Sequence, residues 1–345
     1  RTLATQMARA LKTVAETKAM DPEAKMQYIT NVGDYILEQV ATESMEMMGR
    51  PSQGMAVLAT GGFGRSETMP SSDLDFGVVG HDEDIGLIRE ITTLMASKVN
   101  LARGILAEQL GLPVGMKAGF EADPLWLQSP TSVEPERVAQ SSASKGTVED
   151  ARAIKTFAGT ERDGSDLIPR FGVARGAVRD SDVALEALGM AAEQYAPPGA
   201  VSINQQYNIK EPWLRLMGMT FQKLATYFTL HATNTKGRIA ELGMMGHLDD
   251  KTAEELTAAF DILASIRQSL HSHYKGEKDD FFSGPHEAPE GVYKLSGEQF
   301  KAFSTANGIL NTFHAQLAVF MRSGGKTFKE EKKKEEKKKT FFGLF

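Results

Sequence analysis

Apolar residues recur at helical spacing through the first 49 residues of the chain. They fall at three- and four-residue intervals in two groups, over residues 3–14 and 26–36. Between the groups, Asp21-Pro22 has the form of an N-cap residue followed by proline at the first helical position. The pattern predicts two helices in an N-terminal helical segment, residues 1–49. Helices that bind a partner protein are the alternative interpretation.

Two short apolar runs with strand character follow, over residues 55–60 and 74–79, and a glycine-rich turn lies between them. Residues 84–110 then return to helical spacing. We expect a further strand over residues 112–120, which Asp123-Pro124 would end. This alternation predicts an α/β (α+β) domain with a mixed sheet, to which we assign residues 50–165.

The rest of the chain has mostly helical spacing. A stretch rich in Ser, Pro and Glu over residues 128–146 is typical of a connection, so we place a domain boundary between residues 146 and 200. We assign residues 166–322 to a helical C-terminal domain. Its expected helices lie near residues 181–195, 212–230, 235–245, 251–274 and 297–322.

The last residues, 323–345, differ in composition from the rest of the chain. Residues 326–339 contain eight Lys and four Glu, and we expect no residue before Phe341 to pack. This pattern predicts a charged flexible tail. Its hydrophobic end, FFGLF, resembles a short docking peptide for a groove-bearing partner, and a tag or a crystal contact is the alternative.

Composition excludes several kinds of site. With 41% hydrophobic and 24% charged residues the chain is ordinary for a folded protein, and the absence of Cys excludes disulfides, thiolate metal sites and cysteine nucleophiles. No apolar run approaches the length of about 20 residues that spans a bilayer. We expect a soluble, cytoplasmic protein with no membrane partner. The first residue is Arg1, as in a processed product or part of a longer chain.

Charge argues against nucleic acid as a partner. The formal net charge is -6, and because the tail contributes four positive charges, the remainder carries about -10. Binding to a phosphate backbone requires a basic surface. We therefore expect no nucleic-acid partner.

The run GGFGRSETMPSSDLD, residues 61–75, holds the candidate chemistry. Transfer of a phosphorus group from a nucleoside triphosphate requires backbone donors, a divalent cation and carboxylates that hold the cation. Asp73 and Asp75 lie two apart, so on a strand both face one side, with Leu74 toward the core. Their oxygens suit Mg2+. The residues that can bring the main chain or a hydroxyl to phosphate are Gly61, Gly62, Gly64 and Ser66.

GGFGRSE followed by SSDLD resembles the signature of the DNA polymerase beta nucleotidyltransferase superfamily. Within it the chain is most similar to the nucleotidyltransferase domain of PII uridylyltransferases and to a related bacterial family often joined to CBS domains. The segments LGLPVGMKAGFEADPLW, VEDARAIKTFAGT and NIKEPWLRL agree in order with these families, as do TNTKGRIAELGMMGHL and AFDILASIRQSLH. The likeness spans roughly residues 50 to 275.

The resemblance implies a metal centre. It makes Asp73 and Asp75 metal ligands and catalytic residues, and a third carboxylate is expected with them. Asp150 is our candidate, because it lies in the matching Asp-Ala-Arg segment, and Asp123 and Glu121 are the alternatives.

The resemblance also implies a triphosphate-binding turn. It consists of Gly61, Gly62, Arg65 and Ser72. Lys210 and Arg215 match a stretch of the uridylyltransferases that could reach phosphates, but Glu211-Pro212-Trp213 departs from its glycine-rich form, and ordinary solvated cations are the alternative. We interpret Arg152 as a structural partner of a nearby carboxylate, and expect His271 and His273 to lie on different helix faces.

Together these features predict a nucleotidyltransferase dependent on Mg2+, with Mn2+ as the alternative ion. It would move a nucleoside monophosphate from an NTP such as ATP to a hydroxyl of a protein or small molecule, and release pyrophosphate. The alternative is a non-catalytic nucleotide-binding or interaction protein that retains the fold. The base and the acceptor have no spacing pattern in a sequence.

Overall fold

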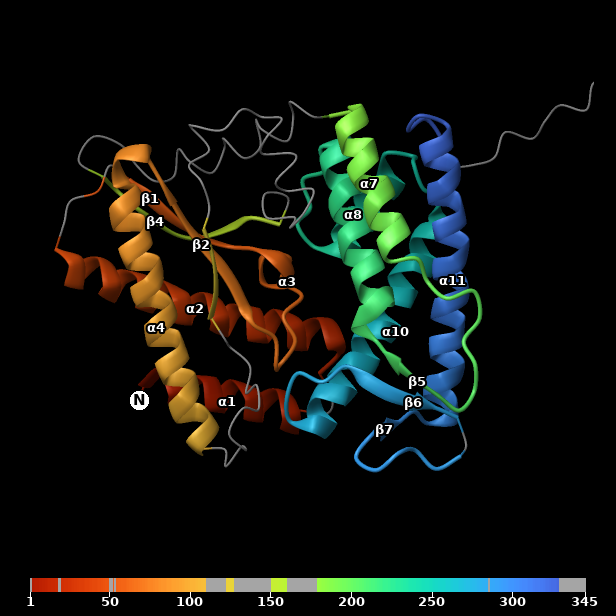
Figure 1. Ribbon diagram of the computed structural model, residues 1–345, viewed down its shortest axis with the longest axis horizontal. Helices are drawn as coiled ribbons and strands as arrows, with labels where there is room; N and C mark the ends of the chain where they lie inside the picture. Colours follow the sequence, from red (N-terminus) through yellow and green to blue (C-terminus); the bar gives the residue numbers. More distant parts are fainter. Residues whose placement is uncertain are drawn as a thin grey trace, which may run out of the picture.

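The computed structural model describes residues 2–17, 20–49, 52, 54–109, 122–126, 150–159, 179–284 and 286–328 of the chain. These residues form two lobes side by side (Figure 1). One lobe is a four-stranded sheet with helices, and the other is mainly helical. The architecture is therefore mixed α/β with a helical C-terminal region, as predicted.

The N-terminal segment forms two helices, α1 (Thr2–Glu16) and α2 (Pro22–Met48). The side chain of Asp21 accepts a hydrogen bond of 2.8 Å from Ala24 N, which satisfies one of the free N–H groups of the first turn. Gly49, in the left-handed region at φ 58°, ends α2. The predicted cap and the proline at the first position of α2 are confirmed.

A mixed sheet forms the centre of the first lobe. Its strand order is β3-β2-β1-β4, with β1 antiparallel to both β2 and β4, and β2 parallel to β3. The strands are β1 (Met55–Ala59), β2 (Leu74–Gly80), β3 (Ala122–Trp126) and β4 (Arg152–Phe157), and the intervening helices are α3 (Gly61–Gly64) and α4 (Ile85–Gln109).

The edges of this sheet differ from the prediction. Asp123-Pro124 does not end a strand but lies inside β3, because an edge strand tolerates proline when its missing N–H faces away from the neighbour. The strand expected over 112–120 lies outside the described residues. The edge strand β4 was not predicted, since its Arg152 and Lys155 interrupt the apolar pattern; they pair with Asp34 and Glu38 of α2.

Helices α1, α2 and α4 share one hydrophobic core with the sheet. Met7, Ile36 and Met95 are fully buried there, together with Val57 and Phe76 of the strands. The N-terminal helices, predicted as a segment of their own, are thus packed into the sheet lobe.

The helical lobe contains the five predicted C-terminal helices. A small sheet in the order β5-β6-β7, which was not predicted, covers one end of them. Figure 1 shows these elements gathered on the side away from α4. They are α7 (Asp182–Gln194), α8 (Arg215–Phe228), α9 (Thr235–Met244), α10 (Asp250–Tyr274) and α11 (Gly297–Arg322), with β5 (Gln205–Asn208), β6 (Asp280–Ser283) and β7 (Tyr293–Lys294).

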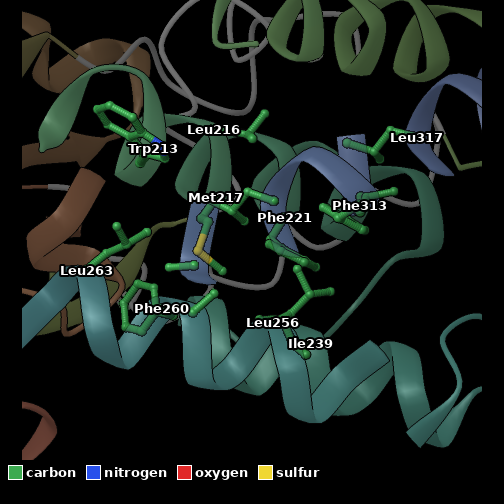
Figure 2. Packing of buried hydrophobic residues seen from close by; sticks show 14 of the residues in the cluster. Trp213, Leu216, Met217, Phe221, Ile239, Leu256, Phe260, Leu263, Phe313 and Leu317 are labelled. Atoms are coloured by element: carbon green, nitrogen blue, oxygen red, sulfur yellow. The ribbon is translucent and has the colours of Figure 1, made fainter. Parts of the chain in front are cut away.

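Large aromatic residues fill the core between these helices (Figure 2). Phe221 of α8 stacks on Phe313 of α11 with ring centroids 5.2 Å apart. Phe328 extends the stack, with its ring centroid 6.4 Å from that of Phe313, and it also stacks on Phe320 at 4.3 Å. Phe328 is buried, so the expectation that no residue before Phe341 packs is wrong. A single aromatic side chain among charged residues can bury a large apolar area in the core.

Contacts of α2 join the two lobes. Gln268 of α10 donates a hydrogen bond to the carbonyl of Pro22, and Lys236 of α9 pairs with both Glu23 of α2 and Asp261 of α10. Met26 is buried in the core of the helical lobe. In the described ranges, no helix is both apolar enough and long enough to cross a lipid bilayer.

Candidate active site

A cleft of about 420 Å³ lies where the two lobes meet. It is lined by most of the residues that the sequence motifs singled out. From the sheet lobe these are Gly61, Gly62, Arg65, Ser72, Asp73, Asp75 and Asp150, and from the helical lobe Lys210 and Arg215. The predicted residues Gly64 and Ser66 are not part of the lining.

The start of β2 presents the two aspartates. Asp73 and Asp75 both line the cleft, while Leu74 between them is fully buried in the core of the sheet lobe. The carbonyl of Asp75 accepts a 2.9 Å hydrogen bond from Thr60 N, which holds β2 against the turn that follows β1. The alternation of a strand therefore exposes both carboxylates to one space.

Gly61 fits closely against Asp75. Its φ of 56° lies in the left-handed region, and a Cβ at this position would clash with Oδ2 of Asp75. Both the backbone conformation and the contact therefore require glycine.

Gly64 and Ser66 serve the turn itself rather than the cleft. A Cβ on Gly64 would clash with the carbonyl of Asp150, so this glycine is needed for packing. Ser66 has a φ of 60° and reverses the chain after α3, with its N–H donated to the carbonyl of Phe63. Ser72 does line the cleft, and its hydroxyl accepts from Met69 N at 3.3 Å.

Arg65 forms two ion pairs inside the site. Its Nε lies 2.7 Å from Glu67 Oε2, and its Nη1 lies 2.5 Å from Asp150 Oδ2. Burial by itself would lower the pKa of Arg65, but the carboxylates of Asp150 and Glu67 outweigh it and raise the pKa above its ordinary value. Arg65 thus stays charged, with two of its nitrogens already engaged.

Asp150, predicted as the third carboxylate, is fully buried at the junction of the lobes. Besides Arg65 it contacts Gln222 Nε2 of α8 at 2.5 Å and Arg238 Nη2 of α9 at 2.9 Å. Two guanidinium groups therefore neutralise it. In this arrangement Asp150 joins Arg65 of the glycine turn to the helical lobe, which differs from the position expected of a metal ligand.

The alternatives for a third carboxylate are placed differently. β3 brings Asp123 into register with Asp75 on the neighbouring strand, whereas Glu121 lies outside the described residues. Within the described ranges, no group of three or more His, Asp or Glu residues is placed to hold a metal ion. Two carboxylates are nevertheless a suitable donor set for Mg2+, which commonly takes its remaining ligands from substrate phosphates and water. Asp73 and Asp75 fit this chemistry.

The opposite wall of the cleft is cationic. Lys210, Arg215 and Arg267 line it together with Glu277. Arg215 pairs with Glu211 at 3.0 Å in an exposed contact on its own helix turn. Lys210 and Arg267, in contrast, both contact Glu277.

Several residues that build the site were missed by the sequence analysis. Glu67 accepts a 2.6 Å hydrogen bond from Thr235 N and so caps α9 from the other lobe. Arg238 occupies a core position in the helical pattern that Ile239 and Leu242 continue, and it is fully buried. A charged residue at a core position of a helix needs a buried partner. The position of Arg238 in the apolar pattern was therefore the signal in the sequence that could have identified it. Arg267, Glu277 and Gln222 gave no such signal.

Two expectations about single residues are confirmed. Arg152 forms a two-point ion pair with Asp34, with distances of 2.7 and 2.8 Å. His271 is buried and bonds Asp279 at 3.0 Å, while His273 contacts the rings of Tyr274 and Tyr293, so the two histidines do not converge.

Comparison with known families adds to this geometry. Residues 5–130 match the family described as "Putative nucleotidyltransferase DUF294", and residues 200–281 match the one described as "Putative nucleotidyltransferase substrate binding domain". Together the two matches cover more than half of the chain. The chain belongs to the DUF294 nucleotidyltransferase family. The family lies within the polymerase beta-like nucleotidyltransferase superfamily that the glycine and aspartate motifs resemble. No curated protein matches the chain.

The two matches of this DUF294 protein fall on the two walls of the cleft. The first match contains α2, the glycine turn and both aspartates, so the N-terminal helices belong to the nucleotidyltransferase match. The second contains Lys210, Arg215, Arg267 and Glu277. The cleft thus lies between the two matched regions.

Proposed function

We propose that this DUF294 protein transfers a nucleoside monophosphate from an NTP to a hydroxyl group and releases pyrophosphate. The observation that carries the proposal is the position of Asp73 and Asp75. Both line a cleft beside the Gly61-Gly62 turn, opposite a wall of cations. The acceptor hydroxyl would belong to a protein or a small molecule.

Asp73 and Asp75 would hold a divalent ion, Mg2+ or Mn2+, together with phosphate oxygens. When bound, this ion would neutralise charge that develops on the phosphates during transfer. Gly61 and Gly62 begin a helical turn, where backbone N–H groups have no acceptor within the helix and can donate to phosphate oxygens. The new bond joins the acceptor oxygen to the α-phosphorus, the bond from that phosphorus to pyrophosphate breaks, and the hydroxyl proton of the acceptor is released to solvent.

The helical wall would hold the rest of the substrate. Lys210 and Arg215 can contact phosphates because a guanidinium or an ammonium group forms charge-assisted hydrogen bonds with them. The match of this region to a substrate-binding domain supports a role of the helical wall in binding substrate. A protein acceptor, ATP as the nucleotide and a cytoplasmic location are parts of this proposal. The docking segment FFGLF lies outside the described residues.

One observation favours a second candidate, a nucleotide-binding protein without catalysis. Asp150 is neutralised by Arg65 and Arg238, so of the proposed three carboxylates only Asp73 and Asp75 are placed for a metal. Such a protein would bind nucleotide in the same cleft and release no pyrophosphate.

Turnover with each of the four labelled NTPs, with Mg2+ or Mn2+ and with or without cell lysate, tests the proposal. We expect label transfer or pyrophosphate release by the wild type. The Asp73→Asn, Asp75→Asn double variant should lose at least about 1000-fold of this rate, because the metal ligands act on the transition state. Asp250→Asn, an exposed aspartate in the first turn of α10, is the matched control and should retain full activity. Nucleotide binding without turnover by the wild type would favour the second candidate.

A further inference from the structure

Two cations of the helical wall converge on one carboxylate oxygen. Lys210 Nζ lies 2.9 Å and Arg267 Nη2 lies 3.4 Å from Oε1 of Glu277. All three residues line the cleft. The side chains of Arg267 and Glu277 are only 10% and 11% exposed, so solvent screens this contact less than it screens a surface pair. An anionic oxygen is thus already bound at the wall.

The backbone around Lys210 is fixed independently of Glu277. Asn208 Oδ1 accepts hydrogen bonds of 3.1 and 3.0 Å from the backbone N–H groups of Lys210 and Glu211. Asn208 also ends β5, which pairs with β6 opposite Asp280. The backbone at Lys210 therefore keeps its place if Glu277 moves.

Arg267 is likewise held from behind. Its Nε lies 2.7 Å from Asp279 Oδ1, and the same carboxylate contacts His271 Nε2 at 3.0 Å. Burial alone would raise the pKa of Asp279, but its bonds to His271 and Arg267 keep that pKa below its ordinary value. Asp279 therefore remains ionised near neutral pH and orients Arg267 without help from Glu277.

Glu277 itself comes from a short connection. It lies between Tyr274, the last residue of α10, and Asp280, the first residue of β6. Asp279, which holds Arg267, lies in the same connection and is itself fixed by a 2.8 Å hydrogen bond from Ile209 N to its carbonyl. Movement of the Glu277 carboxylate away from the cations therefore requires a change in the side-chain rotamer of Glu277 alone. Lys210 thus precedes α8 and Arg267 lies on α10, whereas Glu277 lies in the connection that follows α10.

We propose that Lys210 and Arg267 form a phosphoanion subsite which Glu277 occupies until a phosphate group of the substrate displaces it. Two cations that meet at one oxygen can each bond a phosphate, whose several oxygens offer more acceptors than a carboxylate does. The inference rests on the proposed function, because the phosphate is that of its substrate. It belongs either to the tail of the NTP or to a phosphorylated acceptor.

Binding of inorganic tripolyphosphate without metal ion, measured by titration calorimetry with EDTA present, tests the subsite. Glu277→Gln should bind the probe about fivefold more tightly than the wild type, because a carboxylate no longer competes for Lys210 and Arg267. Lys210→Met should weaken binding by a similar factor. Lys251 and Glu255 form an exposed pair on α10, and the matched controls Lys251→Met and Glu255→Gln should change nothing.

Unchanged or weaker binding by a folded Glu277→Gln variant would overturn the subsite. If that variant does not fold, Lys210→Met decides, since Lys210 is one-third exposed and its replacement should be tolerated. Wild-type affinity in Lys210→Met would then overturn the proposal.

Competition by NTP with Mg2+ identifies the source of the phosphate. Displacement of tripolyphosphate assigns the subsite to the tail of the NTP, and simultaneous binding assigns it to a phosphorylated acceptor. The two proposals can also fail separately. Tighter tripolyphosphate binding by Glu277→Gln, in a protein that turns over no NTP, would support the subsite and contradict the transferase proposal. Turnover of NTP by a protein in which Glu277→Gln leaves the tripolyphosphate affinity unchanged would support the transferase proposal and contradict the subsite.

Discussion

The two walls of the cleft differ in charge and in construction. The sheet wall carries the carboxylates of Asp73 and Asp75, and the helical wall carries Lys210, Arg215 and Arg267. Apart from Asp150, the sheet wall comes from one short run of chain, residues 61–75, and backbone contacts shape it at Gly61. The helical wall gathers residues from distant parts of the chain through ion pairs. A single added carbon should therefore damage the first wall, whereas a change of charge should alter the second.

A third set of contacts keeps the walls together. Asp150 binds Arg65 of the turn and Arg238 of α9, while Glu67 joins Arg65 to the start of α9. These contacts are buried, unlike the ion pair of Lys236 with Glu23 at the outer side of the junction. The position of one wall relative to the other depends on this buried charge balance.

The largest expected effect follows from removal of that balance. Asp150→Asn should lower the free energy of unfolding by about 3–5 kcal/mol, because it removes the buried carboxylate that Arg65 and Arg238 share. Asp34→Asn is the matched control, since Asp34 pairs with Arg152 at a site where both side chains are 26% exposed. It should cost about 1 kcal/mol. Urea denaturation measures both, and equal losses would mean that Asp150 is no more important than a surface partner.

The next largest effect concerns the close contact between Gly61 and Asp75 on the sheet wall. Gly61→Ala should lower turnover at least about 100-fold, because a shift of about 1 Å at a reacting group has this effect. Gly49→Ala is the control: Gly49 has nearly the same φ, 58° against 56°, but a Cβ there meets nothing within 4 Å. Both variants should lose about 1 kcal/mol of stability from the left-handed backbone. Equal turnover of the two would show that the contact with Asp75 is unimportant.

The smallest effect concerns His271, which contacts Asp279, the partner of Arg267 in the cationic wall. Burial lowers the pKa of His271 below its ordinary 6.5, although the bond to Asp279 opposes this. At a pH between the lowered pKa of His271 in the folded protein and its ordinary pKa in the unfolded chain, the unfolded chain binds a proton that the folded protein does not. Stability should therefore fall as the pH drops below about 6.5, by at most about 1.4 kcal/mol per pH unit.

Asp279 does not contribute to the fall in stability just below pH 6.5. Its pKa is lowered, so its stabilisation is complete above the unfolded value of about 3.9. The difference between wild type and His271→Gln in urea unfolding from pH 7 to pH 5 isolates the histidine, since His247, whose pKa burial also lowers, is present in both. Identical pH dependence of the two proteins would contradict the assignment.

The same contrast explains what the sequence could predict. Asp73, Asp75 and the glycine turn lie in one run, and the alternation around Leu74 was enough to place both carboxylates on one side. The long helices were also predictable, because their apolar faces repeat over many turns. The short edge strand β4 was not, since its charged residues Arg152 and Lys155, which pair with α2, interrupt the apolar pattern.

Contacts across the cleft lay beyond sequence reasoning. Asp150 lines the cleft, and its partners Gln222 and Arg238 lie on helices of the other lobe. Nothing in local spacing connects Lys210 with Glu277, which respectively follow β5 and precede β6 and meet where these two strands pair. Side-chain partners at such separations follow from tertiary packing.

A crystal structure with Mn2+ and a non-hydrolysable NTP tests the central claim most directly, because the anomalous signal of manganese locates the ion. We predict a manganese peak within about 2.2 Å of a carboxylate oxygen of both Asp73 and Asp75, with the triphosphate against the Gly61-Gly62 turn. Nucleotide bound outside the cleft, or manganese bound away from these two aspartates, would contradict the account.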